Sequence, residues 1–315
     1  MSQQNQHLSE SLEHTTSKPL SRRKMLRMSA TAIGGTMLGL RLGQRGLALA
    51  HTNNENETVA PQSLRSGSRD RKHFVIIHGA WHNKRALKGL ARKLKREGHS
   101  VTIPTMPGHR PNDPRRSTVT FDDYVQKIVR VVEKKYHPGK PIVLVGHSSA
   151  GFLLQSAAPL VADKLERLIF NNAWILQTGQ SQFDLVPPEI AGLMIDLAAA
   201  AGDNSVPVLE DFVRNTLMAG DLVANQDALL EILVPQPLPL FTTAIDTTAF
   251  DALSTPKSVV YCQDDTSLPP GAFLGMASAG LRSFDLIEIP GGHETLFTHP
   301  EAMATALLQA VGITV

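Results

Sequence analysis

Short, mostly apolar runs alternate with longer amphipathic stretches along the last three quarters of the chain. The runs are rich in valine, isoleucine and leucine, and each is followed by a glycine, a proline or a polar turn. Apolar residues at consecutive positions are typical of strands buried on both faces of a parallel sheet. On this pattern the predicted strands are 72–77, 100–103, 141–145, 165–170, 257–262 and 284–289.

The stretches between these runs have helical spacing. In 84–97, Leu87, Leu90 and Leu94 share one face, and the seven basic residues elsewhere are interpreted as a solvated face. Further predicted helices are 121–136, 152–158, 272–279 and 301–311. Strands that alternate with helices predict an α/β fold, with a mostly parallel sheet covered by helices on both faces.

The alternation stops between about 177 and 254. Helical pieces are expected at 188–201, 209–218 and 221–234, separated by breaks that contain proline or glycine, and no strand run is visible. We interpret this segment as a helical cap inserted between two strands of the sheet.

A serine turn directly follows the run 141–145. The motif is Gly-x-Ser-x-small, with Gly146, Ser148 and Ala150 at its defined positions. A strand, a sharp turn with a central serine and a helix make a nucleophile elbow, in which small residues let strand and helix cross closely. Ser148 is therefore the predicted nucleophile.

A serine hydroxyl needs a base within hydrogen-bond reach, and the base needs an orienting carboxylate. In such folds the chain order is serine, acid, histidine. The loop after the next-to-last predicted strand carries Asp264 and Asp265, and the loop after the last carries His293. We predict His293 as the base. Asp265 is favoured as the acid by its spacing to the following Leu-Pro pair, with Asp264 as the alternative.

The tetrahedral intermediate of acyl transfer needs preorganised N–H donors for its oxyanion. One predicted donor is the backbone N–H of Ser149, just after the nucleophile, and the other is that of Ala80, on the loop after the first strand.

Together these residues resemble the α/β-hydrolase superfamily, and within it the branch of plant methylesterases, hydroxynitrile lyases and bacterial relatives. The resemblance covers roughly 72–313. The motifs that carry it are His78-Gly79-Ala80-Trp81-His82, Gly98-His99, Gly146-His147-Ser148, Asp265-Thr266-Ser267-Leu268-Pro269 and Gly292-His293. The resemblance implies an α/β-hydrolase fold and a Ser-His-Asp triad.

Two positions separate the chain from the lyases of that branch. The lyases carry a lysine after the catalytic histidine and a threonine in the oxyanion loop, where this chain has Glu294 and Gly79. A glutamate would repel a departing cyanide anion, so the resemblance implies a hydrolase. Relatives also carry an Asp-Ala-Phe-like turn where this chain has Asn171-Asn172-Ala173-Trp174, so no substrate contact is carried over from that carboxylate.

The predicted function is the cleavage of a carboxylic ester through an acyl-enzyme. A small or medium apolar ester is expected, because apolar cap residues are candidates to line the pocket: Leu185, Leu193, Phe212, Leu238 and Phe241. Two alternatives stay open, since a triad does not choose its substrate. The same triad could act on a lactone, an amide or a C–C bond, or the fold could be a silent ligand-binding member of the superfamily.

The N-terminus predicts an export signal. Arg22 and Arg23 precede a modestly apolar run, 28–40, and an A-x-A-like site ends at Ala50. This order is typical of a twin-arginine-type signal peptide, assigned to 1–50, and the run is too weak for a stable membrane span. A polar flexible linker, 51–71, and a hydrolase domain, 72–315, would follow, so a periplasmic or secreted bacterial protein is expected.

Charge and cysteine content limit which kinds of binding partner and cofactor are expected. The 315 residues carry a formal charge of +2, but 1–50 hold seven Lys or Arg against two Asp or Glu, leaving 24 basic and 27 acidic residues in the remainder. A nucleic-acid partner therefore gains no support. Cys262 is the single cysteine and is expected to be an inert buried thiol. No metal-ligand cluster stands out, the loop histidines His78 and His82 are interpreted as structural, and no cofactor is implied.

Overall fold

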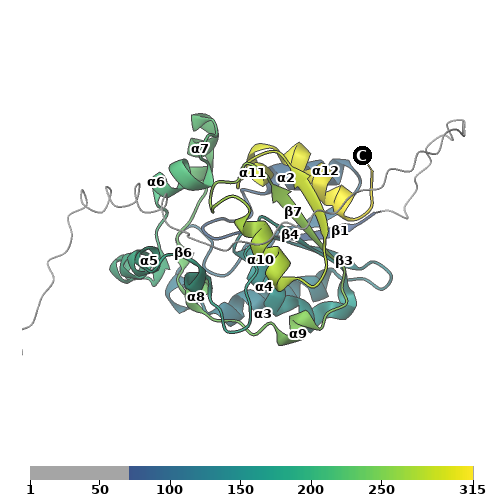
Figure 1. Cartoon of the computed structure of the whole chain (residues 1–315), viewed down its shortest axis with the longest axis horizontal. Helices are drawn as coiled ribbons and strands as arrows, with labels where there is room; N and C mark the ends of the chain where they lie inside the picture. Colours follow the sequence, from purple (N-terminus) through teal and green to yellow (C-terminus); the bar gives the residue numbers. More distant parts are fainter. Residues whose placement is uncertain (1–70, 315) are drawn as a thin grey trace, which may run out of the picture. The chain divides into compact units, whose positions relative to one another are not determined.

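The computed structural model describes residues 71–314, and the predicted signal peptide and all of the predicted linker except Arg71 lie outside them. A six-stranded sheet has the order β2-β1-β3-β4-β7-β8, and every neighbouring pair is parallel (Figure 1). Its strands are β1 (His73–Ile77), β2 (Ser100–Thr102), β3 (Ile142–His147), β4 (Leu165–Asn171), β7 (Lys257–Cys262) and β8 (Asp285–Ile289). The predicted α/β class is confirmed.

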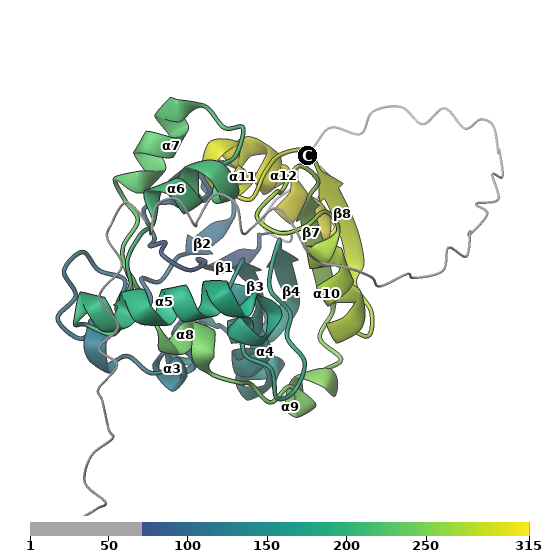
Figure 2. The same cartoon turned by 60° about the vertical axis from the view of Figure 1, so that its left-hand side comes forward.

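Strand side chains alternate between two cores because the side-chain period of a strand is two. In β1, Phe74 and Ile76 point to one core, and Val75 and Ile77 to the other. The first core is covered by α2 (Lys88–Arg96), α11 (Thr295–Thr298) and α12 (Pro300–Ala310), and the second by α3 (Phe121–Lys135), α4 (Ala150–Ala157) and α10 (Ala272–Gly280) (Figure 1; Figure 2 shows all but α2 from another side). Burial on both faces accounts for the continuous apolar runs.

The strand order reverses between β1 and β3. The chain passes from β1 outward to β2 and then returns to β3 on the other side of β1. Loops after β1 and β3 therefore leave the carboxyl edge in opposite directions, and this is the position at which open α/β sheets bind ligands.

Helix α2 begins four residues later than predicted. The prediction of a helix from Lys84 is wrong because Asn83 caps a turn instead: its Oδ1 accepts from the N–H of Arg85 at 2.9 Å, and its backbone oxygen accepts from Ala86. Asparagine side chains compete with helical hydrogen bonds in this way. By contrast, α3 starts at Phe121 as predicted, under a capping box between Thr120 and Asp123.

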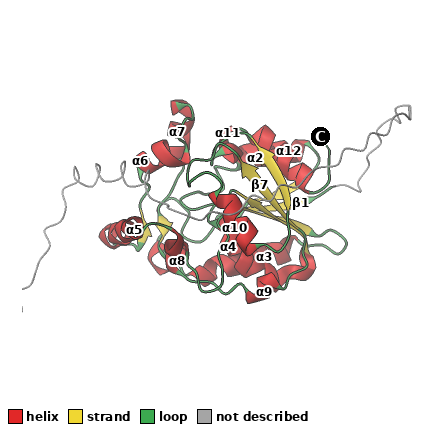
Figure 3. Cartoon of the chain, viewed as in Figure 1, coloured by secondary structure: helices red, strands yellow, loops and turns green. Residues whose placement is uncertain are grey.

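Between β4 and β7 the chain is mainly helical (Figure 3). The elements are α5 (Pro188–Ala201), α6 (Glu210–Phe212), α7 (Val223–Leu230), α8 (Pro239–Thr242) and α9 (Thr248–Asp251). Helix α5 matches its predicted bounds. The stretch predicted at 209–218 divides into α6 and a π-type turn, 213–217, and α7 is shorter than predicted because Ile232 and Val234 bond to Asn83 and Trp81 instead.

The expectation of no strand in this segment is wrong. Strands β5 (Ser205–Val206) and β6 (Gln236–Pro237) form a short antiparallel pair. Two-residue strands are too short to produce a periodic pattern, and a proline within one conceals it further. No helix among residues 71–314 is long and apolar enough to cross a membrane.

Candidate active site

Four loops at the carboxyl edge of the sheet carry the predicted site residues. Ala80 follows β1, Ser148 follows β3, Asp265 follows β7 and His293 follows β8. All four residues are at least nine-tenths buried, and Ser148 is the most exposed of them at 8%. Residues far apart in the chain thus meet because parallel strands end at a common edge.

The backbone of Ser148 has the geometry of a nucleophile elbow. Its φ is +54°, a left-handed value that is unfavourable for a residue with a Cβ. Hydrogen bonds from β4 and the loop after it hold the turn: the Ser148 N–H donates to Asn171, and the N–H of Trp174 donates to the Ser148 carbonyl. A Cβ on Gly151 would lie 2.2 Å from the Trp174 oxygen, so only glycine fits there.

Asp265 and His293 are directly hydrogen bonded. The distance from His293 Nδ1 to Asp265 Oδ2 is 2.7 Å. The other donors to this carboxylate are the Ser267 N–H, 2.8 Å from Oδ1, and the Asn172 side-chain amide. A carboxylate can only accept, so Nδ1 of His293 carries the proton and Nε2 is left with its lone pair. That tautomer is the one a general base requires.

Electrostatics favour the charged forms of this pair. Burial opposes ionisation of Asp265, but the His293 ring and the three hydrogen bonds outweigh it and hold the pKa of Asp265 below its usual value. For His293, burial lowers the pKa, but the hydrogen bond to Asp265 and the charges of Asp265 and Glu294 raise it by more, so the net pKa lies above the ordinary value.

Asp264 has a different environment. Its side chain is exposed, its Oδ2 accepts from the N–H of Gly291 at 2.7 Å, and its own N–H donates to the Gly291 oxygen. It therefore ties the loop after β7 to the loop after β8. Of the two aspartates, the structure places Asp265 against His293.

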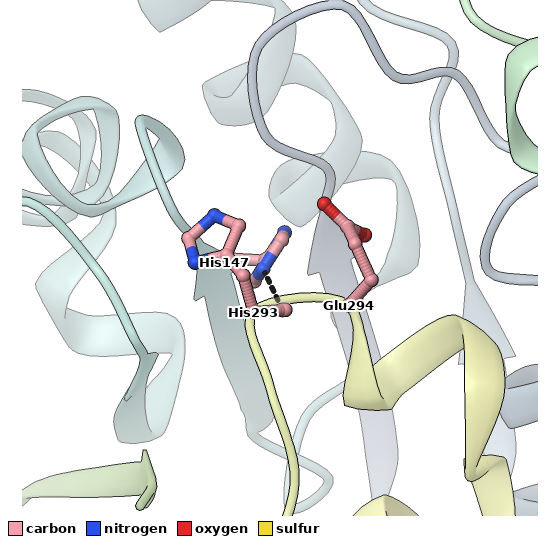
Figure 4. Close-up of side chains that lie close together, drawn as sticks. All are labelled: His147, His293 and Glu294. Atoms are coloured by element: carbon pink, nitrogen blue, oxygen red, sulfur yellow. Dashed lines mark hydrogen bonds between the residues drawn. The ribbon is translucent and has the colours of Figure 1, made fainter. Parts of the chain in front are cut away.

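His147 lies between the serine turn and the histidine loop. Its ring centroid is 4.7 Å from that of His293, and its Nε2 donates to the His293 carbonyl at 3.0 Å (Figure 4). Within the described residues, Ser148 Oγ and His293 Nε2 make no hydrogen bond. Catalytic hydrogen bonds commonly tighten only when substrate binds.

The two predicted oxyanion donors lie on segments that meet at Ser148. Ser149 is the N-cap of α4, at the positive end of its dipole. The loop that carries Ala80 touches the elbow, since a Cβ on Gly79 would lie 2.9 Å from the Ser148 Cβ. Among residues 71–314, nothing accepts a hydrogen bond from the N–H of Ala80 or of Ser149.

A second acid–histidine pair lies beside the first. His82 Nε2 is 3.0 Å from Glu294 Oε2, and both side chains are buried. Burial disfavours the charged form of each, but their mutual attraction outweighs it: the pKa of Glu294 falls to about 2, and that of His82 rises. These shifts favour the charged form of both groups, and the 3.0 Å contact is that of an ion pair.

The group His147, His293 and Glu294 has the donor set of a metal site. One ligand atom from each lies within 4.8 Å of the others (Figure 4). However, His147 Nε2 is bonded to the His293 carbonyl and His293 Nδ1 to Asp265. A cation would have to use His293 Nε2, the lone pair that a general base needs, so this arrangement fits proton transfer better than metal binding.

Several supporting residues were not found by the sequence analysis. Asn172 has a φ of +37°; its Nδ2 donates to Asp265 and its Oδ1 accepts from the Cys262 N–H at 2.7 Å. Ser267 also contacts His293 Nδ1, at 3.1 Å. The non-glycine positive φ of Asn172 has no sequence signal beyond the residue type, because asparagine is enriched in that conformation.

Aromatic rings cover the loop after β1. Trp81 lies 5.3 Å from Phe241 and 5.7 Å from Phe212, centroid to centroid, and Phe273 stacks on His293 at 5.7 Å. Of the predicted pocket residues, Phe241 is fully buried, whereas the remaining ones are half-buried: Leu185, Leu193, Phe212 and Leu238.

Cys262 is buried, and burial raises its pKa to about 12, which leaves it an unreactive thiol at neutral pH.

The profile of the Alpha/beta hydrolase family matches residues 74–306. The chain belongs to this family, and the predicted fold and the prediction of a hydrolase are confirmed. It is 25% identical to Alpha/beta hydrolase nvfD of Aspergillus novofumigatus, over 76% of this chain and 96% of that one. It is 24% identical to the Carbendazim hydrolyzing esterase of Nocardioides sp., over 75% and 98%.

Methylesterase 2 of Arabidopsis thaliana is 26% identical, over 64% of this chain and 81% of its own. Among solved structures, an extracellular α/β-hydrolase from a Paenibacillus species superposes with a TM-score of 0.70 and 29% identity, over 76% of this chain and 98% of that one. Its description states structural and functional homology to tobacco salicylic acid binding protein 2. The relatives thus include proteins named as esterases.

Proposed function

We propose that this protein hydrolyses a carboxylic ester through an acyl-enzyme, with Ser148 as nucleophile, His293 as general base and Asp265 as the residue that orients the base. The observation that carries the proposal is the 2.7 Å contact between Asp265 and His293 at the sheet edge where the strained Ser148 turn also lies. Three relatives whose names or descriptions link them to esterases or hydrolases support the ester as substrate.

The reaction proceeds in two halves. His293 Nε2 takes the proton of Ser148 as Oγ attacks the carbonyl carbon, and the N–H groups of Ala80 and Ser149 stabilise the oxyanion. The tetrahedral intermediate collapses, and His293 passes its proton to the leaving alcohol. Water then attacks the acyl-enzyme with His293 again as base, which releases the acid and restores Ser148. Asp265 remains ionised throughout and stabilises the imidazolium.

Glu294 argues against cyanide release at this site. Its pKa of about 2 keeps the carboxylate charged, and it lies next to the catalytic histidine. A developing anion there would meet a negative charge in a buried environment, where repulsion is strong. We therefore prefer ester hydrolysis, and we propose a small or medium apolar ester because the cover over the site is rich in aromatic and aliphatic side chains. Lactones, amides and C–C bonds remain substrates to compare in parallel assays.

The test is the substitution Ser148→Ala with p-nitrophenyl acetate and butyrate. Turnover should fall to background, and labelling by a fluorophosphonate should disappear, while the circular dichroism spectrum stays unchanged. Ser283→Ala, at an exposed serine, is the matched control and should behave as wild type. Turnover retained in Ser148→Ala would exclude Ser148 as nucleophile, and a wild-type protein that neither labels nor turns over would favour the silent binding member.

We also propose that residues 1–50 direct export and that 72–315 form the hydrolase domain, with a cap at about 177–254. The paired Arg22 and Arg23 support export, as does the extracellular relative from Paenibacillus. In a bacterial host with a twin-arginine pathway, the full chain should appear in the periplasm. Changing both arginines to lysine should retain it in the cytoplasm with full esterase activity, and unchanged export would refute the assignment.

A further inference from the structure

The proposed chemistry leaves the buried His82–Glu294 pair without a role. His82 lies on the loop that follows β1, two residues after Ala80, and Glu294 directly follows His293. The pair is separated by 212 residues in sequence, and both side chains are at most 3% exposed. Each ion loses its hydration when it is buried, and this desolvation is unfavourable, so a pair of this kind needs a physical reason.

We propose that His82 and Glu294 are positioning residues for the proposed ester hydrolysis: their ion pair ties the loop that presents the Ala80 N–H to the loop that presents His293, and it keeps a negative charge beside the imidazole that gains a proton during the reaction. The inference rests on the proposed function and assigns a role to two residues outside the triad.

The proton positions in the pair follow from its partners. His82 Nδ1 is 2.7 Å from the carbonyl oxygen of Ala80, and Nε2 is 3.0 Å from the Glu294 carboxylate. Both partners only accept while Glu294 is ionised, so both ring nitrogens of His82 donate and the ring is an imidazolium. One side chain therefore holds the backbone of the predicted oxyanion residue and the side chain next to the catalytic histidine.

The loop after β1 has a strained backbone, so it needs hydrogen bonds that fix its conformation. Trp81 has a φ of +60°, a conformation that persists only when its surroundings fix it. The Ala80 carbonyl is bonded to His82, the Trp81 N–H donates to Gln236 Oε1 at 3.1 Å, and the His82 carbonyl accepts from His109 Nδ1 at 2.6 Å. Bonds on both sides of Trp81 thus fix the peptides that determine where the Ala80 N–H points.

The charge of Glu294 acts on the other loop. It is among the causes that raise the pKa of His293, after Asp265. Figure 4 shows the Glu294 carboxylate and the rings of His147 and His293 on the same side of the loop after β8. Glu294 Oε1 and His147 Nδ1 have no hydrogen-bond partner among the described residues, so the carboxylate is not fully neutralised by hydrogen bonding. It therefore stabilises the imidazolium form of His293 in a site of low dielectric constant.

Two substitutions separate geometry from charge. In Glu294→Gln, a neutral His82 can keep its Nδ1–H bond to Ala80 and accept a hydrogen bond from the new amide at Nε2. The link between the two loops therefore remains, and the negative charge at residue 294 is lost. In Glu294→Leu both are lost. Glu288→Gln, at an exposed glutamate of β8, is the charge-matched control. All variants are measured as the full chain, with kcat, KM and the pH dependence of kcat/KM for p-nitrophenyl butyrate.

Glu294→Gln should keep most of the plateau kcat, and the midpoint of its pH profile should move down by about 0.5 to 1 unit, because the imidazolium has lost a stabilising charge. Glu294→Leu should lose roughly 10- to 100-fold in kcat with KM changed less than about threefold, because a displaced oxyanion donor affects the transition state more than substrate binding. The control should match wild type in both.

An unmoved or raised pH midpoint in Glu294→Gln would overturn the inference, and this readout holds even where Glu294→Leu fails to fold. Wild-type kcat in a folded Glu294→Leu would also overturn it. The proposed function would survive either result, provided that Ser148→Ala is inactive. Full turnover in Ser148→Ala would instead refute the proposed function itself.

Discussion

His293 Nδ1 lies 2.7 Å from Asp265 Oδ2, across 28 residues of sequence and between the loops that follow β7 and β8. The contact is buried, and it defines both the proton position on the ring and the charge beside it.

The rate should depend on pH through His293. The base must be neutral to take the serine proton, and burial lowers its pKa less than Asp265 and Glu294 raise it. The logarithm of kcat/KM should therefore rise with pH and level off, with a midpoint above the ordinary histidine value of about 6.5. A profile for p-nitrophenyl acetate between pH 5 and 9 measures this. A flat profile, or a midpoint below 6.5, would contradict a histidine base paired with a carboxylate.

Asp265→Asn should lower kcat by about 10³- to 10⁴-fold, because an amide facing Nδ1 favours the wrong tautomer of His293. Asp264→Asn is the matched control, since an exposed amide oxygen there can still accept from Gly291. It should stay close to wild type. Steady-state kinetics of both variants decide the matter, and the reverse ranking would move the acid role to Asp264.

Gly151→Ala should destabilise the fold and displace the elbow. The new Cβ would lie 2.2 Å from the backbone oxygen of Trp174, a contact that cannot form without movement of the chain. We expect a loss of about 1 to 3 kcal/mol in the free energy of unfolding, as for overpacked cores, together with reduced kcat. Gly192→Ala, inside α5 with open space around it, should gain about 0.5 to 1 kcal/mol instead.

Urea denaturation at pH 7 compares the two glycine variants directly. Equal stability of both would show that the neighbourhood of Gly151 yields to a methyl group, as it does at the Ala150 position of the same turn.

The stability should depend on pH through Glu294 and His82. A carboxyl whose folded pKa is depressed to about 2 contributes stability above its unfolded pKa, and loses it as the pH falls toward 2. His82, with a raised folded pKa, contributes below its unfolded pKa and loses that contribution as the pH rises through the folded value. The pair therefore stabilises most between about pH 4.5 and 6.5.

Denaturation midpoints across pH 3 to 9 test this window. In Glu294→Gln the stability should change less with pH on both sides of this window. Glu294→Ala should lower the free energy of unfolding by about 3 to 5 kcal/mol near pH 6, because it leaves the His82 charge buried and unpaired. A wild-type stability that is constant from pH 6 down to 3 would contradict the ion pair.

Local pattern was enough for the six strands of the parallel sheet and for most helices. The run at 142–145 and the bounds of α5 needed only burial periodicity and a terminal proline, which are properties of neighbouring residues. The start of α2 was missed because Asn83 caps a turn through the N–H groups of Arg85 and Ala86, and its side-chain amide also donates to Ile232, 149 residues away. The β5–β6 pair was missed because two residues are too few to show a period.

In the candidate site, too, some features follow from local sequence and others only from the fold. The order of Ser148, Asp265 and His293 along the chain is a sequence property, since each follows a recognisable strand. The supports of the site are not: Asn172 holds Asp265 from 93 residues away, and His82 pairs with Glu294 across 212. Side chains of these types occur throughout the chain, and only their convergence at one sheet edge distinguishes them.

Sequence alone was enough to predict that apolar runs would form a parallel sheet and that the serine between Gly146 and Ala150 would stand at its edge, because both features depend on local sterics and on burial with a short period. Only the folded chain shows which aspartate faces His293, that the Asn172 side-chain amide and the Ser267 backbone N–H hold that aspartate, and that a second acid–histidine pair lies beside the first. Those contacts depend on how loops from different strands converge, and the energies of buried charges and hydrogen bonds are set by that convergence.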